Sequence, residues 1–200
     1  MKKSLLLLTL LLVLGGNSMA FDNLRKGFVL GAGIGFSPTV KTEVDATIAP
    51  GSEDDFYLGS LSGSEQGLAF QLLFGYGFNE HTVLAYEGDV SWYYYENIIP
   101  DDKLNILQGF NSIMLYHYWG SVGNSFFTAA GVGLTYWDTN YTDPNQSELG
   151  FVLGAGFEFS PHLQLGAYWG NGKTKNTDFP GVEFEGTHTN LSIVLTAVGY

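Results

Sequence analysis

The segment from Gly67 to Phe78, GLAFQLLFGYGF, decides the fold, because its two alternating sets of residues differ in kind. The first set is large and apolar or aromatic: Leu68, Phe70, Leu72, Phe74, Tyr76 and Phe78. The second set is mostly small or polar: Gly67, Ala69, Gln71, Leu73, Gly75 and Gly77. A period of two residues predicts a β-strand with two chemically different sides.

Seven further segments of this kind can be drawn along the chain. The eight predicted strands are 27–37, 66–78, 81–95, 105–118, 125–137, 149–160, 162–171 and 187–200. Their only charged residues are Glu87, Asp89 and Glu158, whereas a soluble domain has about a quarter to a third of its surface charged. We therefore expect the apolar sides to face lipid, in an all-β, eight-stranded antiparallel transmembrane β-barrel with up-and-down order. A soluble, lipocalin-like barrel is the alternative fold.

The first twenty residues fit a secretory signal peptide. Lys2 and Lys3 precede the apolar stretch 5–14, and Ser18-Met19-Ala20 provides a small-x-small cleavage site. The stretch is shorter than the about 20 residues that a membrane-spanning helix needs, although a retained anchor is an alternative. We expect residues 1–20 to be removed and residues 21–200 to form a barrel in the outer membrane of a Gram-negative bacterium.

Composition excludes several classes of chemistry. The chain has no cysteine, which excludes disulfides, thiolate metal sites, a cysteine nucleophile and lipoprotein acylation. Without Lys2 and Lys3, 6 basic residues stand against 20 acidic ones, a net charge of −14. We therefore expect no nucleic-acid partner.

The connections and the aromatic residues support the barrel. Short connections near residues 79–80, 120–124 and 160–161 alternate with long polar ones at 38–65, 96–104, 138–148 and 172–186, as periplasmic turns and extracellular loops do. Aromatic residues gather at both predicted membrane interfaces. The outer girdle would contain Phe36, Trp92, Tyr94, Tyr136 and Trp169, and the periplasmic girdle Phe28, Tyr76, Phe78, Tyr116, Tyr118, Phe159 and Tyr200.

The last strand does not fit one register. Leu191, Ile193 and Leu195 occupy the lipid-facing phase, while Val198 and Tyr200 fall in the opposite phase. A β-bulge near Thr196 would bring both groups to the same face.

Together these features resemble the small eight-stranded outer membrane barrels, the superfamily of the outer membrane protein A barrel domain and outer membrane protein X. The resemblance rests on the opening strand Gly27-Phe28-Val29-Leu30-Gly31-Ala32-Gly33, the short turns, and the final aromatic Tyr200. It implies that Val198 and Tyr200 form the signal read by the barrel-assembly machinery, with Tyr where Phe is usual. It also implies outer membrane lipid and lipopolysaccharide as surroundings.

The alternation predicts which polar residues point into the barrel. The predicted lumen-polar site contains Gln71, Glu87, Asp89, Asn111 and Glu158, together with Ser91, Tyr93, His117 and Gln164. No strand supplies a basic partner for the three carboxylates, so each must be hydrated, protonated or hydrogen-bonded. Inward glycines remove bulk: Gly31, Gly33, Gly35, Gly75, Gly131, Gly133, Gly154 and Gly156. We therefore expect a lumen that holds water, either a polar plug or a narrow cation-favouring passage.

Cofactor and catalytic sites find little support in the sequence. Gly31-Ala-Gly33-Ile-Gly35 imitates a dinucleotide fingerprint, but Pro38 and a polar loop follow in place of the required helix. His188-Thr189-Asn190 is faintly similar to the His-x-Ser-Asn element of lipid A deacylases, without a serine in place. No triad can be assembled, so we expect no catalytic residue, no cofactor and no metal site.

The predicted function is therefore a non-enzymatic, structural or surface-interaction role. The four long loops contain 15 of the 20 acidic residues, and they would meet an extracellular ligand. A narrow cation-favouring diffusion channel is the first alternative, and a lipid A-modifying enzyme of the deacylase type is the second. The sequence leaves the ligand and the oligomeric state open.

Overall fold

The computed structural model describes residues 24–48, 57–99, 102–139, 146–176 and 182–200. They form eight strands: β1 (Gly27–Ile48), β2 (Tyr57–Asn79), β3 (Thr82–Ile99), β4 (Asp102–Tyr118), β5 (Ser125–Thr139), β6 (Gln146–Ser160), β7 (Leu163–Asn176) and β8 (Val182–Gly199). The predicted signal peptide, residues 1–20, lies outside the described residues.

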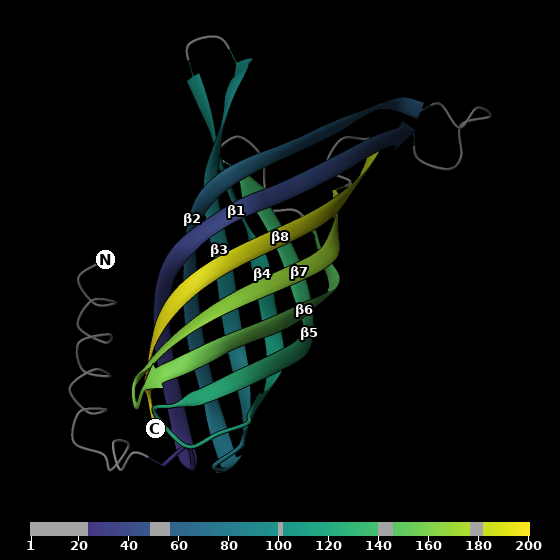
Figure 1. Cartoon of the computed structure of the whole chain (residues 1–200). Helices are drawn as coiled ribbons and strands as arrows, with labels where there is room; N and C mark the ends of the chain where they lie inside the picture. Colours follow the sequence, from purple (N-terminus) through teal and green to yellow (C-terminus); the bar gives the residue numbers. More distant parts are fainter. Residues whose placement is uncertain (1–23, 49–56, 100–101, 140–145, 177–181) are drawn as a thin grey trace, which may run out of the picture.

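The strands close into one barrel in sequence order. Each strand pairs antiparallel with the next, and β1 also pairs with β8, from Leu30 opposite Gly199 to Ile48 opposite Val182 (Figure 1). Closure leaves no unpaired strand edge within the barrel wall, so backbone groups along the wall bond within the chain. Beyond the wall, residues 57–67 of β2 pair with β1 but have no partner on β3 among the described residues. The described residues include no helix long and apolar enough to cross a bilayer.

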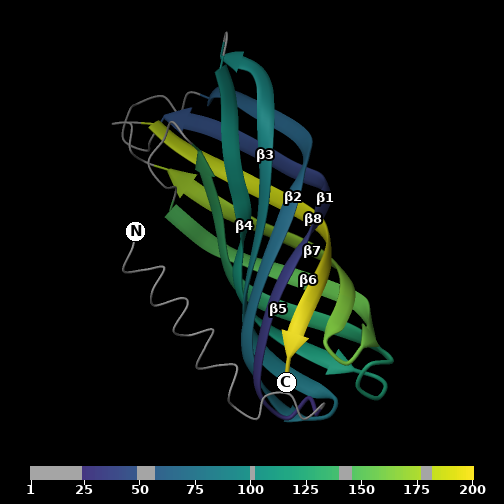
Figure 2. The ribbon, with the colours of Figure 1, turned by 90° about the vertical axis from the view of Figure 1, so that its left-hand side faces the viewer.

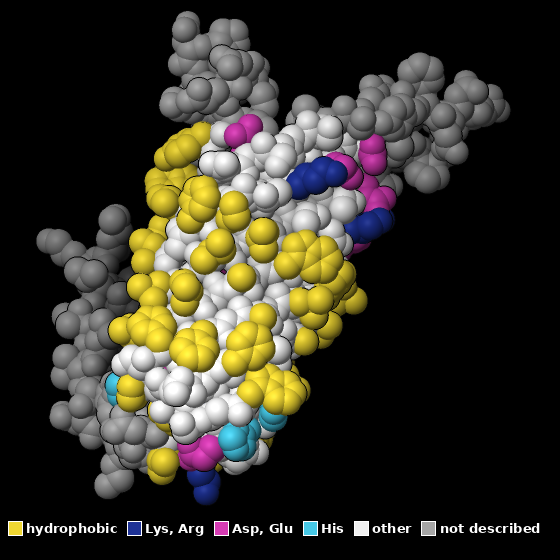
Figure 3. Space-filling view, viewed as in Figure 1, with side chains coloured by type: hydrophobic (Ala, Val, Ile, Leu, Met, Phe, Trp, Pro, Cys, Tyr) yellow, Lys and Arg dark blue, Asp and Glu magenta, His cyan; other side chains and the backbone are white. Residues whose placement is uncertain are grey.

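The outward face is apolar over most of the height of the barrel. Leu72 is 68% exposed, and its neighbours in the same phase of β2, Phe70 and Phe74, are also exposed. Figure 3 shows hydrophobic side chains spread over the body of the barrel, with charged side chains gathered near its two ends. The predicted assignment of the two sides of Gly67–Phe78 is therefore confirmed, because Ala69, Gln71 and Leu73 are buried.

Aromatic residues lie at both ends of this belt, as the sequence predicts, with exceptions. Those exposed toward the end opposite the short turns are Phe36, Trp92, Tyr94 and Trp169, and those exposed toward the short turns are Phe28, Tyr76, Phe78 and Phe159. Tyr136 is half-buried. The prediction was wrong for Tyr116, Tyr118 and Tyr200, which are buried inside the barrel. All three belong to the inward phase of their strands, where their rings fill space.

The last strand needs no bulge near Thr196. Its pairing with β7 is continuous from Asn176 opposite Phe184 to Leu163 opposite Ala197. Ile193 and Leu195 point outward, while Val198 and Tyr200 are buried. The two groups were expected to share a face, and the structure places them on opposite faces in one uninterrupted alternation. Assembly recognition through Val198 and Tyr200 stays a prediction.

The strands continue well past the apolar belt at one end. β1 and β2 stay paired from Val40 opposite Glu65 to Thr47 opposite Tyr57, within a segment predicted to be a loop. Figure 1 shows this hairpin reaching outward beyond the barrel body, and Figure 2 shows the β3–β4 hairpin rising at the same end. Outside the membrane a strand has no lipid-facing side, so its sequence loses the apolar alternation that marks the rest.

The face assignment gives a direct stability prediction. Leu72→Arg places a charge at the middle of the apolar belt, and we expect it to lower the free energy of unfolding by roughly 2–4 kcal/mol. Urea titration in phospholipid bilayers measures the change. Ser62→Arg is the matched control, because Ser62 is exposed on the outward phase of the same strand and pairs with Glu43 beyond the belt. Equal stability of the two variants would contradict the assignment.

Candidate functional site: the barrel interior and its two ends

Glu87 lies at the centre of a hydrogen-bond network across the barrel interior. Its carboxylate accepts hydrogen bonds from the Tyr116 hydroxyl of β4 and from Gln71 Nε2 of β2, the latter at 3.0 Å. Gln71 Oε1 in turn accepts a hydrogen bond from Thr196 Oγ1 of β8 at 2.6 Å. The network connects four strands through side chains that are all buried.

Asp89 forms a second network farther from the short β2–β3 turn. Ser192 Oγ donates to Asp89 Oδ2 at 3.1 Å, and Asn190 Nδ2 donates to Asp89 Oδ1 at 3.2 Å. Asn190 Nδ2 also donates to Ser91 Oγ at 2.8 Å, and Ser91 Oγ lies 2.5 Å from Ser37 Oγ. This carboxylate is therefore compensated by neutral donors, as burial requires.

Glu158 has an ionic partner that the sequence did not reveal. Arg25, just before β1, is fully buried and forms an ion pair with Glu158, with Nε 3.1 Å from Oε2. Its guanidinium also donates to the backbone oxygens of Glu80 at 2.7 Å and Gly120 at 3.0 Å, and lies 4.0 Å from the ring centroid of Tyr118. Arginine suits this position because its planar fork of donors serves several acceptors at once.

The Arg25 cluster closes the end of the barrel where the short turns lie. Glu158 was expected to have no basic partner, because no predicted strand contains a lysine or an arginine. Arg25 lies two residues before the first strand, in a predicted mature chain with few basic residues. That scarcity was the signal that could have identified it.

A polar cluster fills the opposite mouth. Gln108 Oε1 accepts hydrogen bonds from Thr42 Oγ1 at 2.7 Å and from the Tyr93 hydroxyl at 3.0 Å. His188 Nε2 lies 2.8 Å from Thr174 Oγ1, and the His188 ring stacks on Trp137 with centroids 5.9 Å apart. These hydrogen-bonded and aromatic side chains fill the interior at this end of the barrel.

His188 is inside the barrel, which removes the support for a lipid-side catalytic base. Its side chain is fully buried, and the next residue, Thr189, accepts a hydrogen bond from Asn171 Nδ2 at 2.8 Å. His81 and His162 bond backbone oxygens at the opposite end. Within the described residues, no three His, Cys, Asp or Glu side chains are grouped as a metal site.

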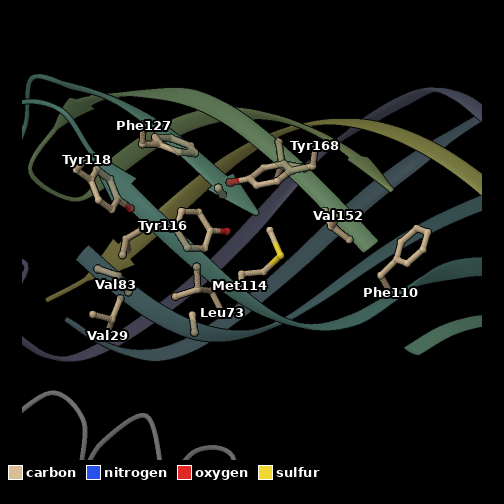
Figure 4. Packing of buried hydrophobic residues seen from close by; sticks show 14 of the residues in the cluster. Val29, Leu73, Val83, Phe110, Met114, Tyr116, Tyr118, Phe127, Val152 and Tyr168 are labelled. Atoms are coloured by element: carbon tan, nitrogen blue, oxygen red, sulfur yellow. The ribbon is translucent and has the colours of Figure 1, made fainter. Parts of the chain in front are cut away.

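Aromatic side chains occupy the space that the interior glycines leave. A Cβ added at Gly154 or at Gly166 would lie 2.6 Å from a ring carbon of Tyr168, too close for a real contact. At Gly156 the added atom would collide with the ring of Phe127, and at Gly131 with the sulfur of Met114. Figure 4 shows these side chains packed between the strands. Rings from neighbouring strands therefore fill much of the space that the inward glycines leave, and the interior resembles the expected polar plug more than an open passage.

Two predicted lumen residues point outward. Asn111 is exposed on the outer surface, where its Oδ1 accepts a hydrogen bond from the Tyr86 hydroxyl at 2.9 Å. His117 is also exposed, and its ring lies edge-on to Trp119 with centroids 4.5 Å apart. Both were assigned from a β4 register that is shifted by one residue, and such a shift moves every side chain to the other face. Gln71, Glu87, Asp89 and Glu158 are inside, along with Ser91, Tyr93 and Gln164.

Removing one partner of the buried ion pair should be costly. We expect Arg25→Met to lower the free energy of unfolding by about 3–5 kcal/mol, because Glu158 would stay buried without its cation. The double variant Arg25→Met/Glu158→Gln is the control, since it removes both charges, and it should recover most of the loss. Urea titration of the refolded variants tests this, and a double variant no more stable than the single one would contradict it.

The mouth cluster predicts a specific pH dependence. His188 lies opposite Thr42 of β1 and Gly172 of β7. Gly172 is three residues beyond Trp169, which marks the end of the apolar belt, so His188 lies outside the belt. Burial lowers the pKa of His188 to about 4, below the about 6.5 of an exposed histidine. As pH falls from about 6.5 to 4, the unfolded chain takes up a proton that the folded chain does not. The folded state should lose up to about 3 kcal/mol in this window.

The difference between wild type and His188→Gln isolates this contribution, because all other titrating groups are shared. Unfolding free energies of both proteins, measured at pH 7.5 and at pH 4.5, give the difference. We expect the wild type to lose more stability than the variant, and parallel losses would contradict the buried neutral imidazole.

Several known proteins are similar to this chain. Similar solved structures include Neisserial surface protein A, at 14% identity and TM-score 0.47, covering 86% of this chain and 97% of that one. Ail, the attachment invasion locus protein of Yersinia pestis, solved with the heparin analogue sucrose octasulfate, has 13% identity and TM-score 0.41, covering 84% and 99%. The outer membrane protease OmpT from Escherichia coli has 8% identity and TM-score 0.45, covering 92% and 99%.

No match was found among curated proteins. The family model of the outer membrane protein beta-barrel domain matches residues 8–196, nearly the whole chain. The structure fits this description, because a closed barrel of antiparallel strands with an apolar outer belt is the form in which β-strands cross an outer membrane. The chain therefore belongs to the outer membrane protein beta-barrel domain family and is an outer membrane protein.

Proposed function

We propose that this barrel is non-enzymatic and acts through the surface of its extracellular strand extensions. The observation that carries the proposal is the filled interior. The lumen is occupied by Tyr116, Phe127 and Tyr168. One end is closed by the ion pair of Arg25 and Glu158, and the other by the polar cluster that contains His188. A barrel with its interior occupied along its length offers its outer surfaces for interaction.

The extensions form a paired sheet beyond the apolar belt. β1 pairs with β2 as far as Thr47 opposite Tyr57, and with β8 as far as Ile48 opposite Val182. β7 adds a fourth strand, with Lys175 opposite Glu185. Backbone pairing holds this surface in one shape without support from the membrane, so a partner would meet a surface that is already ordered.

Several exposed side chains of this sheet are charged. Lys41 forms an ion pair with Glu43, and Lys173 with Glu185. The Lys173 ammonium holds the pKa of Glu185 below its ordinary value, mainly through their hydrogen bond. Other acidic residues of the predicted loops, among them Glu53-Asp54-Asp55, lie outside the described residues. The acidic excess favours a partner with a basic surface.

A binding experiment tests the extensions. Residues 42–63 are replaced by Gly-Ser-Gly, and proteoliposomes with wild type or variant are compared on surfaces coated with poly-lysine and with heparin. We expect wild type to bind poly-lysine in a salt-sensitive manner, and the shortened variant to bind less while keeping heat-modifiable gel mobility. Equal binding by both proteins, or preference for heparin, would contradict an acidic working surface.

Conductance in a planar bilayer separates this function from the narrow channel. The filled interior predicts no discrete openings for wild type or for Glu87→Gln/Asp89→Asn, with folding confirmed by heat-modifiable mobility. Cation-selective openings that change in the double variant would instead support a passage through the lumen and contradict the proposal.

A further inference from the structure

One amide interrupts the apolar belt on the outside of the barrel. Asn111 of β4 is exposed and pairs with Gly88 of β3 on one side and Leu134 of β5 on the other. Gly88 lies four residues from outward-facing Leu84 and four from Trp92, so Asn111 is near the middle of the belt. Among the described side chains that face outward between the two aromatic girdles, it is the only amide.

The surroundings of Asn111 form a shallow polar notch. Gly88 has no side chain to cover it, and a Cβ added there would meet nothing closer than Asn111 Oδ1 at 3.5 Å. The Tyr86 hydroxyl donates to Asn111 Oδ1 at 2.9 Å, and the Tyr136 hydroxyl, which lies over Gly109, donates to the backbone oxygen of Asp89 at 3.4 Å. We call Tyr86, Gly88, Gly109, Asn111 and Tyr136 the amide notch.

The amide notch leaves a donor unused. Asn111 Oδ1 has a partner, but Nδ2 donates to no acceptor among the described residues. A polar hydrogen facing hydrocarbon is costly, because no water is present to accept it. Lipid ester oxygens lie at the headgroup level and acyl chains carry no acceptor, so lipid alone cannot satisfy this group at mid-depth.

We propose that the amide notch is the contact site of a homodimer. All copies insert in the same direction, so two barrels meet about a twofold axis along the membrane normal, which brings each notch against its own copy. A carboxamide carries both donor and acceptor atoms and is therefore self-complementary. The absence of a side chain at Gly88 lets the two walls approach closely, as small residues do in other membrane interfaces.

This assignment is independent of the proposed extracellular function. It uses the outward face of β3 and β4 within the membrane, and the extensions take no part in it. A lipid-filled notch or a different protein at the notch are the competing outcomes of the experiment.

Cysteine crosslinking provides the test, because the chain has no cysteine of its own. Gly88→Cys places a thiol in the notch, where the structure has room for it. Ala167→Cys is the matched control, since Ala167 is exposed on β7, on the opposite side of the barrel. After mild oxidation in bilayers, we expect a disulfide-linked dimer from Gly88→Cys and none from Ala167→Cys.

Asn111→Leu then identifies the amide as the cause. In the Gly88→Cys background we expect it to weaken dimerisation about tenfold, with heat-modifiable mobility unchanged because a leucine suits the lipid-facing position. Equal crosslinking from both cysteine sites, a yield unaffected by Asn111→Leu, or exclusive crosslinking to another protein would each overturn the homodimer.

Discussion

The pairing of β1 with β8 is the constraint on which the rest of the structure depends. In hydrocarbon every backbone N–H and C=O that lacks a partner costs several kcal/mol, so a sheet can cross the bilayer only when its two edges meet. Eight strands closed in this way leave an interior just wide enough for side chains. Closure therefore fixes both the outer surface, which must be apolar, and the inner one, which must be filled.

The interior is filled by large aromatic side chains that pack against glycines of neighbouring strands. Glycines at inward positions such as Gly154 and Gly166 let the ring of Tyr168 lie against the wall, and Gly156 does the same for Phe127. Neutral donors compensate the carboxylates Glu87 and Asp89 in this interior, and of the three buried carboxylates only Glu158 has a cationic partner among the described residues. Neutral networks hold a narrow barrel together without requiring several buried cations.

The sequence predicts strands accurately where the two faces of a strand differ in solvent, and less well elsewhere. The face assignment of Gly67–Phe78 is correct because lipid and lumen demand different residues. Beyond the belt β1 has no lipid-facing side and its apolar alternation is lost, so a loop was expected where the strand continues to Ile48. In β4, Tyr116 and Tyr118 suit either a girdle or a lumen, and only pairing with β3 decides between them. The ion pair of Arg25 could not be predicted from the strand patterns, because Arg25 lies before the first strand.

Asn111 differs in origin from the other polar residues of the strands. Glu87 and Asp89 are polar because they must be held inside a barrel where partners from four strands are within reach. Asn111 faces the side on which the fold demands apolar residues, and leucine would satisfy every constraint that closure imposes there. Closure of the barrel requires neither Asn111 nor the neighbouring Gly88. We therefore attribute this pair to a contact with a second molecule. Self-association through the β3–β4 wall supplies that contact, and it places one interaction surface within the membrane and another beyond it.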